Sequence, residues 1–108
     1  MLFRFAAGLP DEEVAALVRQ FHDLALTSRD RGDPYILSIE SGLQSSPEGA
    51  DHGFERAFIV SFASEGDRNY YAGRPLVTDN DHLDVAHDAF KAAVEPALAD
   101  VLVFDFQI

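Results

Sequence analysis

Residues 54 to 63, Phe-Glu-Arg-Ala-Phe-Ile-Val-Ser-Phe-Ala, are the stretch that decides the fold of this chain. Aromatic and β-branched residues dominate it, which is typical of a β-strand whose side chains alternate between two faces. One face carries Phe54, Arg56, Phe58, Val60 and Phe62, and the other carries Ala57, Ile59 and Ser61. Because both faces are largely apolar, we expect other protein elements to cover this strand on both sides.

The residues before this strand predict a strand, a helix and a second strand. Leu2 to Ala6 is a short strand rich in Phe. Pro10 and the three acidic residues after it predict the start of a helix, since the positive end of the helix dipole favours negative charge. From Val14 to Ala25, apolar residues recur at three- and four-residue spacing, as in an amphipathic helix. Tyr35 to Leu43 is the next predicted strand, and its alternation places Tyr35, Leu37 and Ile39 on one face.

The residues after position 63 predict two helices and a closing strand. Ser64 is the expected N-cap of a short helix that passes through Tyr71 and ends near Gly73. A further helix is expected from about His82 to Ala97, with its apolar residues on one side. Val101 to Ile108 is predicted to be the fourth strand.

This order, β-α-β-β-α-β, predicts a single α+β domain over residues 1–108 with a ferredoxin-like arrangement. One helical layer would cover one face of a four-stranded sheet and leave the other face, also apolar, in water. Burial of ~700 Å² per subunit at ~25 cal/mol/Å² would contribute on the order of 17 kcal/mol before association costs. We therefore expect a homodimer formed through the sheet face, because one patch then serves both subunits.

The composition excludes several classes of partner and of site. Nineteen acidic residues face eight basic ones, and the net charge of −11 repels phosphate backbones and anionic lipids, so neither nucleic acid nor membrane is expected as a partner. No apolar run approaches the ~20 residues of a spanning helix. The apolar stretch Met1 to Phe5 is too short for a signal peptide, so the expected location is cytoplasmic. The absence of Cys excludes disulfides, thiolate nucleophiles and Cys-ligated metals.

Tyr71 and His87 are the candidate catalytic residues. An imidazole titrates near neutral pH and can act as a base, while a phenol can donate a hydrogen bond to the developing negative charge on a carbonyl oxygen. The expected ligand-binding residues around them are aromatic or aliphatic: Phe5, Tyr35, Leu37, Phe58 and Phe90. The alternative interpretation makes His87 a side chain that fixes the start of the last helix and makes Tyr71 a packing residue.

Two other groups of polar residues have simpler interpretations. Asp79, Asp81, His82, Asp84, His87 and Asp88 are close in sequence. Their spacing matches no metal-ligand motif, and acidic residues favour the start of a helix, so no metal or cofactor is expected. The alternative interpretation is a site that binds Mg²⁺. Arg56 lies on an apolar strand face and is expected to pair with Glu40 or Asp105, with anion binding as the alternative.

Several segments together resemble the stress-responsive dimeric α/β-barrel (Dabb) family. They are Leu2–Phe5, Ser46–Gly49 with Gly53-Phe54, Ala57–Phe62, Asp67-Arg68 with Tyr70-Tyr71, Ala86-His87 with Phe90, and Val101–Phe106. The resemblance implies a dimeric α+β barrel formed by two ferredoxin-like units packed sheet to sheet. This chain departs from the family pattern in the longer segment, Ala72 to Val85, that precedes His87.

Members of that family include plant stress proteins and small polyketide cyclases such as olivetolic acid cyclase. The resemblance to the cyclases implies that His87 is the base and that Tyr71 assists it. It implies a cofactor-free enzyme of lyase or isomerase type, or a ligand binder, that acts on an apolar carbonyl or polyketide-like compound. The alternative is a non-catalytic stress-responsive or accessory protein whose stable dimer is its main property.

Overall fold

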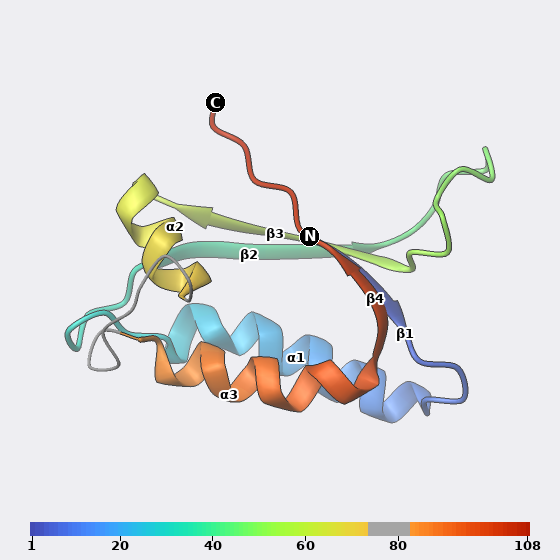
Figure 1. Cartoon of the computed structure of the whole chain (residues 1–108), viewed down its shortest axis with the longest axis horizontal. Coiled ribbons are helices and arrows are strands. Elements are labelled where there is room, and N and C mark those ends of the chain that lie inside the picture. Colours follow the sequence, from blue (N-terminus) through green and yellow to red (C-terminus); the bar gives the residue numbers. More distant parts are fainter. Residues whose placement is uncertain (74–82) are drawn as a thin grey trace.

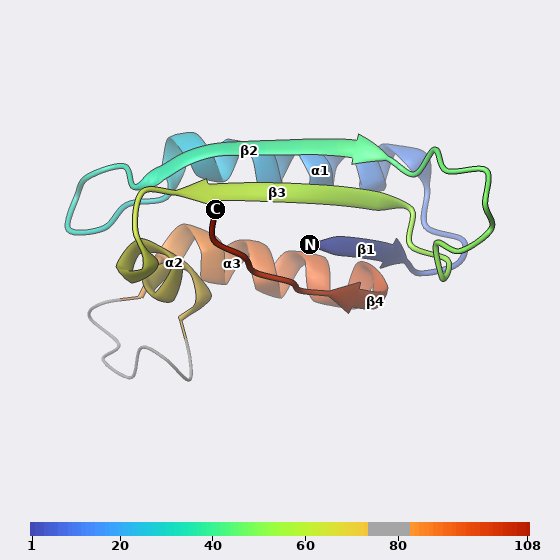
Figure 2. The ribbon, with the colours of Figure 1, turned by 90° about the horizontal axis from the view of Figure 1, so that it is seen from above.

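Four antiparallel strands form one sheet, and two helices lie side by side against one of its faces (Figure 1, Figure 2). The structure, a computed structural model, describes residues 1–73 and 83–108. The elements are β1 (Leu2–Phe5), α1 (Asp11–Thr27), β2 (Ile36–Leu43), β3 (Arg56–Phe62), α2 (Glu65–Ala72), α3 (Val85–Val94), the 3₁₀ helix η2 (Glu95–Ala97) and β4 (Leu98–Leu102). The strand order β2-β3-β1-β4 confirms the ferredoxin-like α+β fold.

The core lies between the sheet and helices α1 and α3, and aromatic rings fill its centre. Phe21 of α1 is completely buried, and its ring stacks on Phe58 of β3 with 4.4 Å between centroids. Phe3 of β1 and Phe90 of α3 pack against the same ring at 5.8 and 4.8 Å. Rings this close stabilise a core through their large buried area and their favourable mutual orientation.

The opposite face of the sheet carries apolar side chains that remain exposed. Leu2 of β1 lies opposite Ala57 of β3 on one side and opposite Leu102 of β4 on the other. Ile59, two residues after Ala57 on the same face, is 51% exposed, and Leu102 is 40% exposed. In the part of the chain that the structure describes, neither α1 nor α3 approaches this face, as Figure 1 shows. We call it the open face.

All four strands are shorter than the sequence predicts, and β3 and β4 differ most from their predicted ranges. β3 begins at Arg56, so Phe54 lies outside it. β4 runs from Leu98 to Leu102, whereas a strand over Val101 to Ile108 was expected. The reason is that β4 pairs with β1, and β1 begins at Leu2, opposite Leu102. The apolar alternation continues beyond this point, but β1 offers no further backbone partner.

A register shift in β2 changes which of its side chains are buried. The expectation that Tyr35, Leu37 and Ile39 share one face is wrong, because the pairing with β3 shifts between Ile36 and Ser38. Ile36 and Ile39 are buried, whereas Leu37 is 66% exposed. A bulge inserts one residue into a strand and so interrupts the two-residue period on which the prediction relied.

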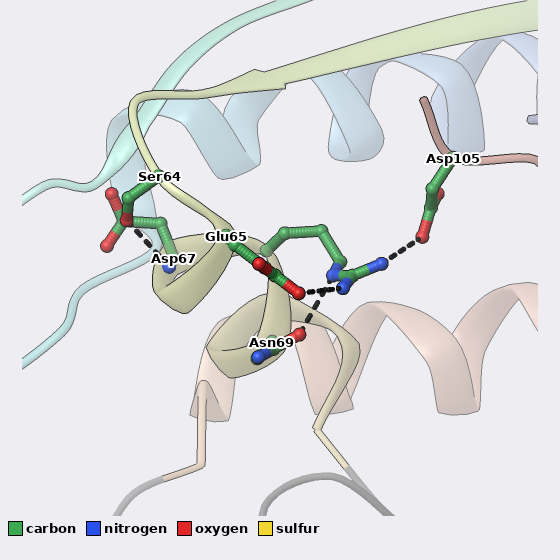
Figure 3. Close-up of polar contacts among 6 residues, drawn as sticks. Ser64, Glu65, Asp67, Asn69 and Asp105 are labelled. Atoms are coloured by element: carbon green, nitrogen blue, oxygen red, sulfur yellow. Dashed lines mark hydrogen bonds and ion pairs between the residues drawn. The ribbon is translucent and has the colours of Figure 1, made fainter. Parts of the chain in front are cut away.

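The predicted ends of α2 are confirmed. The Ser64 side chain accepts a hydrogen bond from the Asp67 amide at 3.1 Å, shown in Figure 3, and so caps the first turn. Gly73 ends the helix with φ +70°, a conformation that glycine adopts without strain. α3 begins at Val85 instead of His82, and residue 82 lies outside the described residues. Within the described ranges, no helix is long and apolar enough to cross a membrane.

Candidate active site

A cavity of about 590 Å³ lies between α3, the end of α2, and strands β1 and β4. Most of its lining is apolar and comes from Met1, Phe3, Phe21, Phe90, Val94, Leu98, Val101 and Val103. The polar or charged residues in the lining are Tyr71, His87, Lys91, Glu95 and Asp100. An apolar cavity with a few polar groups is typical of a site for a small organic ligand.

His87 belongs to the first turn of α3 and is held there by two hydrogen bonds. Its backbone amide donates to Asp84 Oδ1 at 2.9 Å, which makes Asp84 the N-cap of the helix. Its ring Nδ1 lies 2.7 Å from the backbone oxygen of Tyr71. A carbonyl oxygen can only accept, so Nδ1 carries the proton and the lone pair of the neutral ring is on Nε2. The second bond therefore fixes the tautomer in which Nε2 is the basic nitrogen of the ring.

Burial keeps the His87 ring neutral at physiological pH. The side chain is 6% exposed, and loss of water around the charged form lowers its pKa from 6.5 to about 4. The Lys91 ammonium, one turn further along α3, lowers this pKa as well. The Tyr71 carbonyl and the carboxylates of Asp84 and Asp88 oppose these effects without cancelling them. At pH 7 the ring can accept a proton on Nε2.

Tyr71 lies directly against His87. The two rings are nearly parallel, with centroids 3.8 Å apart and an interplanar angle of 14°. Tyr71 is 8% exposed, and its buried hydroxyl has no hydrogen-bond partner among residues 1–73 and 83–108. Burial, followed by the nearby Asp84 carboxylate, raises the pKa of Tyr71, so the hydroxyl stays protonated and remains a donor. A buried hydroxyl without a partner is costly, so any group that accepted its hydrogen bond would stabilise this part of the structure.

A buried tyrosine supports this arrangement from behind. Tyr35, just before β2, donates a hydrogen bond from its hydroxyl to Asp84 Oδ2. Burial and the Asp84 carboxylate both raise the pKa of Tyr35, so this hydroxyl also stays protonated. Tyr70 packs edge-on against the Tyr35 ring at 4.9 Å. Asp84 therefore links the sheet to the first turn of α3, where His87 is located.

The structure brings some of the expected site residues together and separates others. Tyr71, His87 and Phe90 all line the cavity. Phe5 and Phe58 are buried core residues outside its lining, Tyr35 lies behind Asp84, and Leu37 is exposed on the bulge. The sequence interpretation missed Lys91 and Val94, although four- and seven-residue spacing from His87 places both on its side of the helix. It also missed the cavity-lining residues of β1 and β4.

Other polar groups have ordinary structural roles. Among residues 1–73 and 83–108, no three His, Cys, Asp or Glu side chains are arranged to hold a metal ion; Asp79, Asp81 and His82 lie outside these ranges. Asp84 is used by Tyr35 and by the α3 amide, and Asp88 forms an ion pair with Lys91 at 3.7 Å.

The expected pairing of Arg56 with Glu40 or Asp105 is wrong. Asp105 instead pairs with Arg68 at 3.1 Å (Figure 3), and Glu40 lies opposite Ile59 on the open face. Arg56 pairs in the ladder with Leu43. It lies two positions before the buried Phe58, and alternation therefore places it on the core side of the sheet, opposite to the open face that carries Glu40. Its Nε has no acceptor in the described part of the chain.

Solved structures with this fold come from plants and bacteria. The Arabidopsis thaliana protein At3g17210 superposes with a TM-score of 0.78 at 21% identity, over 99% of this chain and 89% of its own. A hydroxynitrile lyase from Passiflora edulis superposes with a TM-score of 0.75 at 17% identity, over 99% of this chain and 87% of its own. A dimeric ferredoxin-like protein of unknown function from Thermobifida fusca superposes with a TM-score of 0.59 at 19% identity, over 92% of this chain and 77% of its own. Identities this low establish a shared fold.

The sequence itself gives the family. No curated protein sequence matches this chain. A family model does match it, over residues 1–108, and describes a stress responsive A/B barrel domain. Since the match spans every element from β1 to the residues beyond β4, the chain belongs to the family of stress-responsive A/B barrel domains.

Proposed function

We propose that this protein is a cofactor-free enzyme, or a ligand binder with the same site, that takes an apolar carbonyl compound into the cavity. His87 is the base and Tyr71 is the hydrogen-bond donor. The observation that carries the proposal is that both residues line one apolar cavity, the first with a fixed neutral tautomer and the second with a buried hydroxyl that has no partner among residues 1–73 and 83–108.

The chemistry requires one proton transfer and one oxygen that gains negative charge. His87 Nε2 would remove a proton either from a C–H beside a carbonyl or from a hydroxyl group. In the first case the C–H electron pair forms an enolate, as in aldol-type polyketide cyclisation. In the second case the oxygen electron pair forms the carbonyl as the C–C bond to cyanide breaks, and the proton held by His87 passes to cyanide, as in cyanohydrin cleavage. Tyr71 would donate its hydrogen bond to the oxygen in both cases.

The low pKa of His87 limits both cases to substrates with a fairly acidic proton. A base with a pKa of about 4 is weak, and proton transfer becomes harder as the donor becomes less acidic. A hydroxyl proton is more acidic than a C–H proton beside a single ketone, whereas a C–H between two carbonyls, as in a β-diketone, is at least as acidic as a hydroxyl. Both cases therefore stay open to this imidazole. The hydroxynitrile lyase among the structural neighbours is consistent with cyanohydrin cleavage, and polyketide cyclisation is the second candidate.

We also propose that the protein is a homodimer formed through the open face. This face exposes Ile59 and Leu102, and structural neighbours from Thermobifida fusca and Bacteroides fragilis are described as dimeric ferredoxin-like proteins. If no reaction is found, the alternative is a stress-responsive accessory protein. In that case the bond from His87 Nδ1 to the Tyr71 oxygen serves only to hold the end of α2 against α3.

The test uses mandelonitrile and a polyketide-like β-diketone as substrates. His87→Asn removes the imidazole base while keeping a side-chain N–H, and Tyr71→Phe removes the hydroxyl while keeping the ring stack. His22→Asn is the matched control, because His22 bonds Ser41 outside the cavity. We expect turnover to fall about 10²- to 10⁴-fold in His87→Asn and to stay unchanged in His22→Asn. Equal turnover in wild type and His87→Asn would remove His87 from the mechanism.

A further inference from the structure

The chain segment Val101–Phe106 begins in β4 and contributes two residues to the cavity wall. Val101 and Val103 line the cavity, and Asp105 forms an ion pair with Arg68 of α2 at 3.1 Å (Figure 3). Leu102, Phe104 and Phe106 alternate with these three residues in the sequence, and residues 103–108 belong to no strand. Leu102, Phe104 and Phe106 are 40%, 71% and 65% exposed, and the cavity-lining Val101 and Val103 are themselves 44% and 61% exposed.

Little in the isolated chain holds this segment in place. The β1–β4 pairing ends at Leu102, and no described residue forms a backbone ladder with the residues that follow. The tether is the pair between Arg68 and Asp105, whose side chains are 34% and 51% exposed. Ion pairs this exposed contribute little to stability. The wall that Val103 provides is therefore weakly supported.

The outward side of the segment continues the open face. Leu102 lies opposite Leu2, and Leu2 lies opposite Ala57. Figure 1 shows the chain beyond Leu102 leaving the sheet on the side opposite to α1 and α3. A second copy that covers the open face would therefore also contact Phe104, and this contact would press Val103 toward the cavity.

We propose that the second copy fixes the Val101–Asp105 wall, so that dimer formation and ligand binding in the cavity strengthen each other. This inference rests on the homodimer proposed above but not on any reaction. The ligand class is a neutral, largely apolar compound, because the wall that the second copy would fix contributes Val101 and Val103. By linkage, the factor by which dimer formation tightens binding at a site equals the factor by which ligand at that site tightens the dimer.

The experiment uses the neutral fluorescent probe N-phenyl-1-naphthylamine and the whole chain. Sedimentation gives the dimer dissociation constant, and probe titrations are then made at protein concentrations below and above it. We expect the dimer to bind the probe at least about five-fold more tightly than the monomer, the lower end of typical coupling. Shifts of the His87 ring signals in NMR spectra establish that the probe occupies the cavity. Equal affinity of monomer and dimer, or a monomer at every concentration, overturns the proposal.

Matched variants separate this coupling from a general effect of added charge. Phe104→Glu places a carboxylate on the outward side of the wall. Leu26→Glu places one on α1, at a residue that is also 71% exposed. We expect Phe104→Glu to weaken both the dimer and probe binding. The probe affinity of this variant should recover at protein concentrations high enough to restore the dimer. Leu26→Glu should change neither. If Phe104→Glu dissociates the dimer without changing probe affinity, the cavity wall does not depend on the partner and the proposed coupling is overturned. The turnover of His87→Asn is a separate measurement that tests only the proposed chemistry.

Discussion

Acidification should destabilise this protein through the buried His87 ring. Burial lowers the pKa of this ring from 6.5 to about 4, so the folded state prefers the neutral form. Below pH 6.5 the unfolded chain binds a proton that the folded chain does not, and the free energy of unfolding falls as pH decreases toward 4. At about 1.4 kcal/mol per pKa unit, the full loss is about 3 kcal/mol. About 2 kcal/mol of it occurs between pH 7 and pH 5.

The assay is urea denaturation of wild type and His87→Asn at pH 7 and at pH 5. Carboxylates and the other histidines titrate in both proteins, so the difference between the two pH dependences isolates His87. Wild type should lose about 2 kcal/mol more than the variant over this interval. The Hε1 signal of His87 in the folded protein should titrate with a midpoint near 4. Equal pH dependences, or a midpoint near 6.5, would refute the argument that burial holds the ring neutral.

Three further substitutions test the packing around the site. Tyr35→Phe leaves the buried Asp84 carboxylate without its phenol donor and should lower the free energy of unfolding in urea by about 2 kcal/mol. The Tyr70 hydroxyl donates to a backbone oxygen at the surface, so Tyr70→Phe should cost less than about 1 kcal/mol. Equal costs would contradict this role of Asp84. Phe21→Ala removes the ring at the centre of the core and should cost about 3–5 kcal/mol by the same measurement; a cost below about 1 kcal/mol would mean that the core packs differently. Gly73→Ala should lower thermal stability by about 2 kcal/mol because of its φ of +70°, and an unchanged Tm would contradict that backbone conformation.

Features with local causes could be predicted from the sequence. The Ser64 cap and the Gly73 stop of α2 depend on a few neighbouring residues, and both were predicted correctly. The order of strands and helices follows from apolar spacing within each segment. The juxtaposition of Tyr71 and His87 came from the family resemblance, because sixteen residues separate them and spacing alone cannot bring them together.

Features with nonlocal causes could not be predicted. The bulge that exposes Leu37 depends on how β2 meets β3, and β4 ends at Leu102 because β1 begins at Leu2. Apolar alternation is a property of one strand, whereas the length of a ladder is a property of two. The bond from Tyr35 to Asp84 joins residues 49 positions apart. The sequence predicts that an acidic residue such as Asp84 favours the start of a helix, and Asp84 does cap α3. Its second hydrogen-bond partner, Tyr35, can be identified only from the three-dimensional structure.

The hydrogen bond between His87 Nδ1 and the Tyr71 oxygen has a consequence for engineering this scaffold. A saturation library at position 87 would select first for residues that offer an N–H to that oxygen, whatever activity is screened. Replacement by an aliphatic residue leaves a helix-terminal carbonyl unmet in an apolar environment. Inactive clones would then mix misfolded proteins with true losses of the base. Libraries restricted to asparagine, glutamine and histidine at this position would give cleaner genotype–phenotype maps.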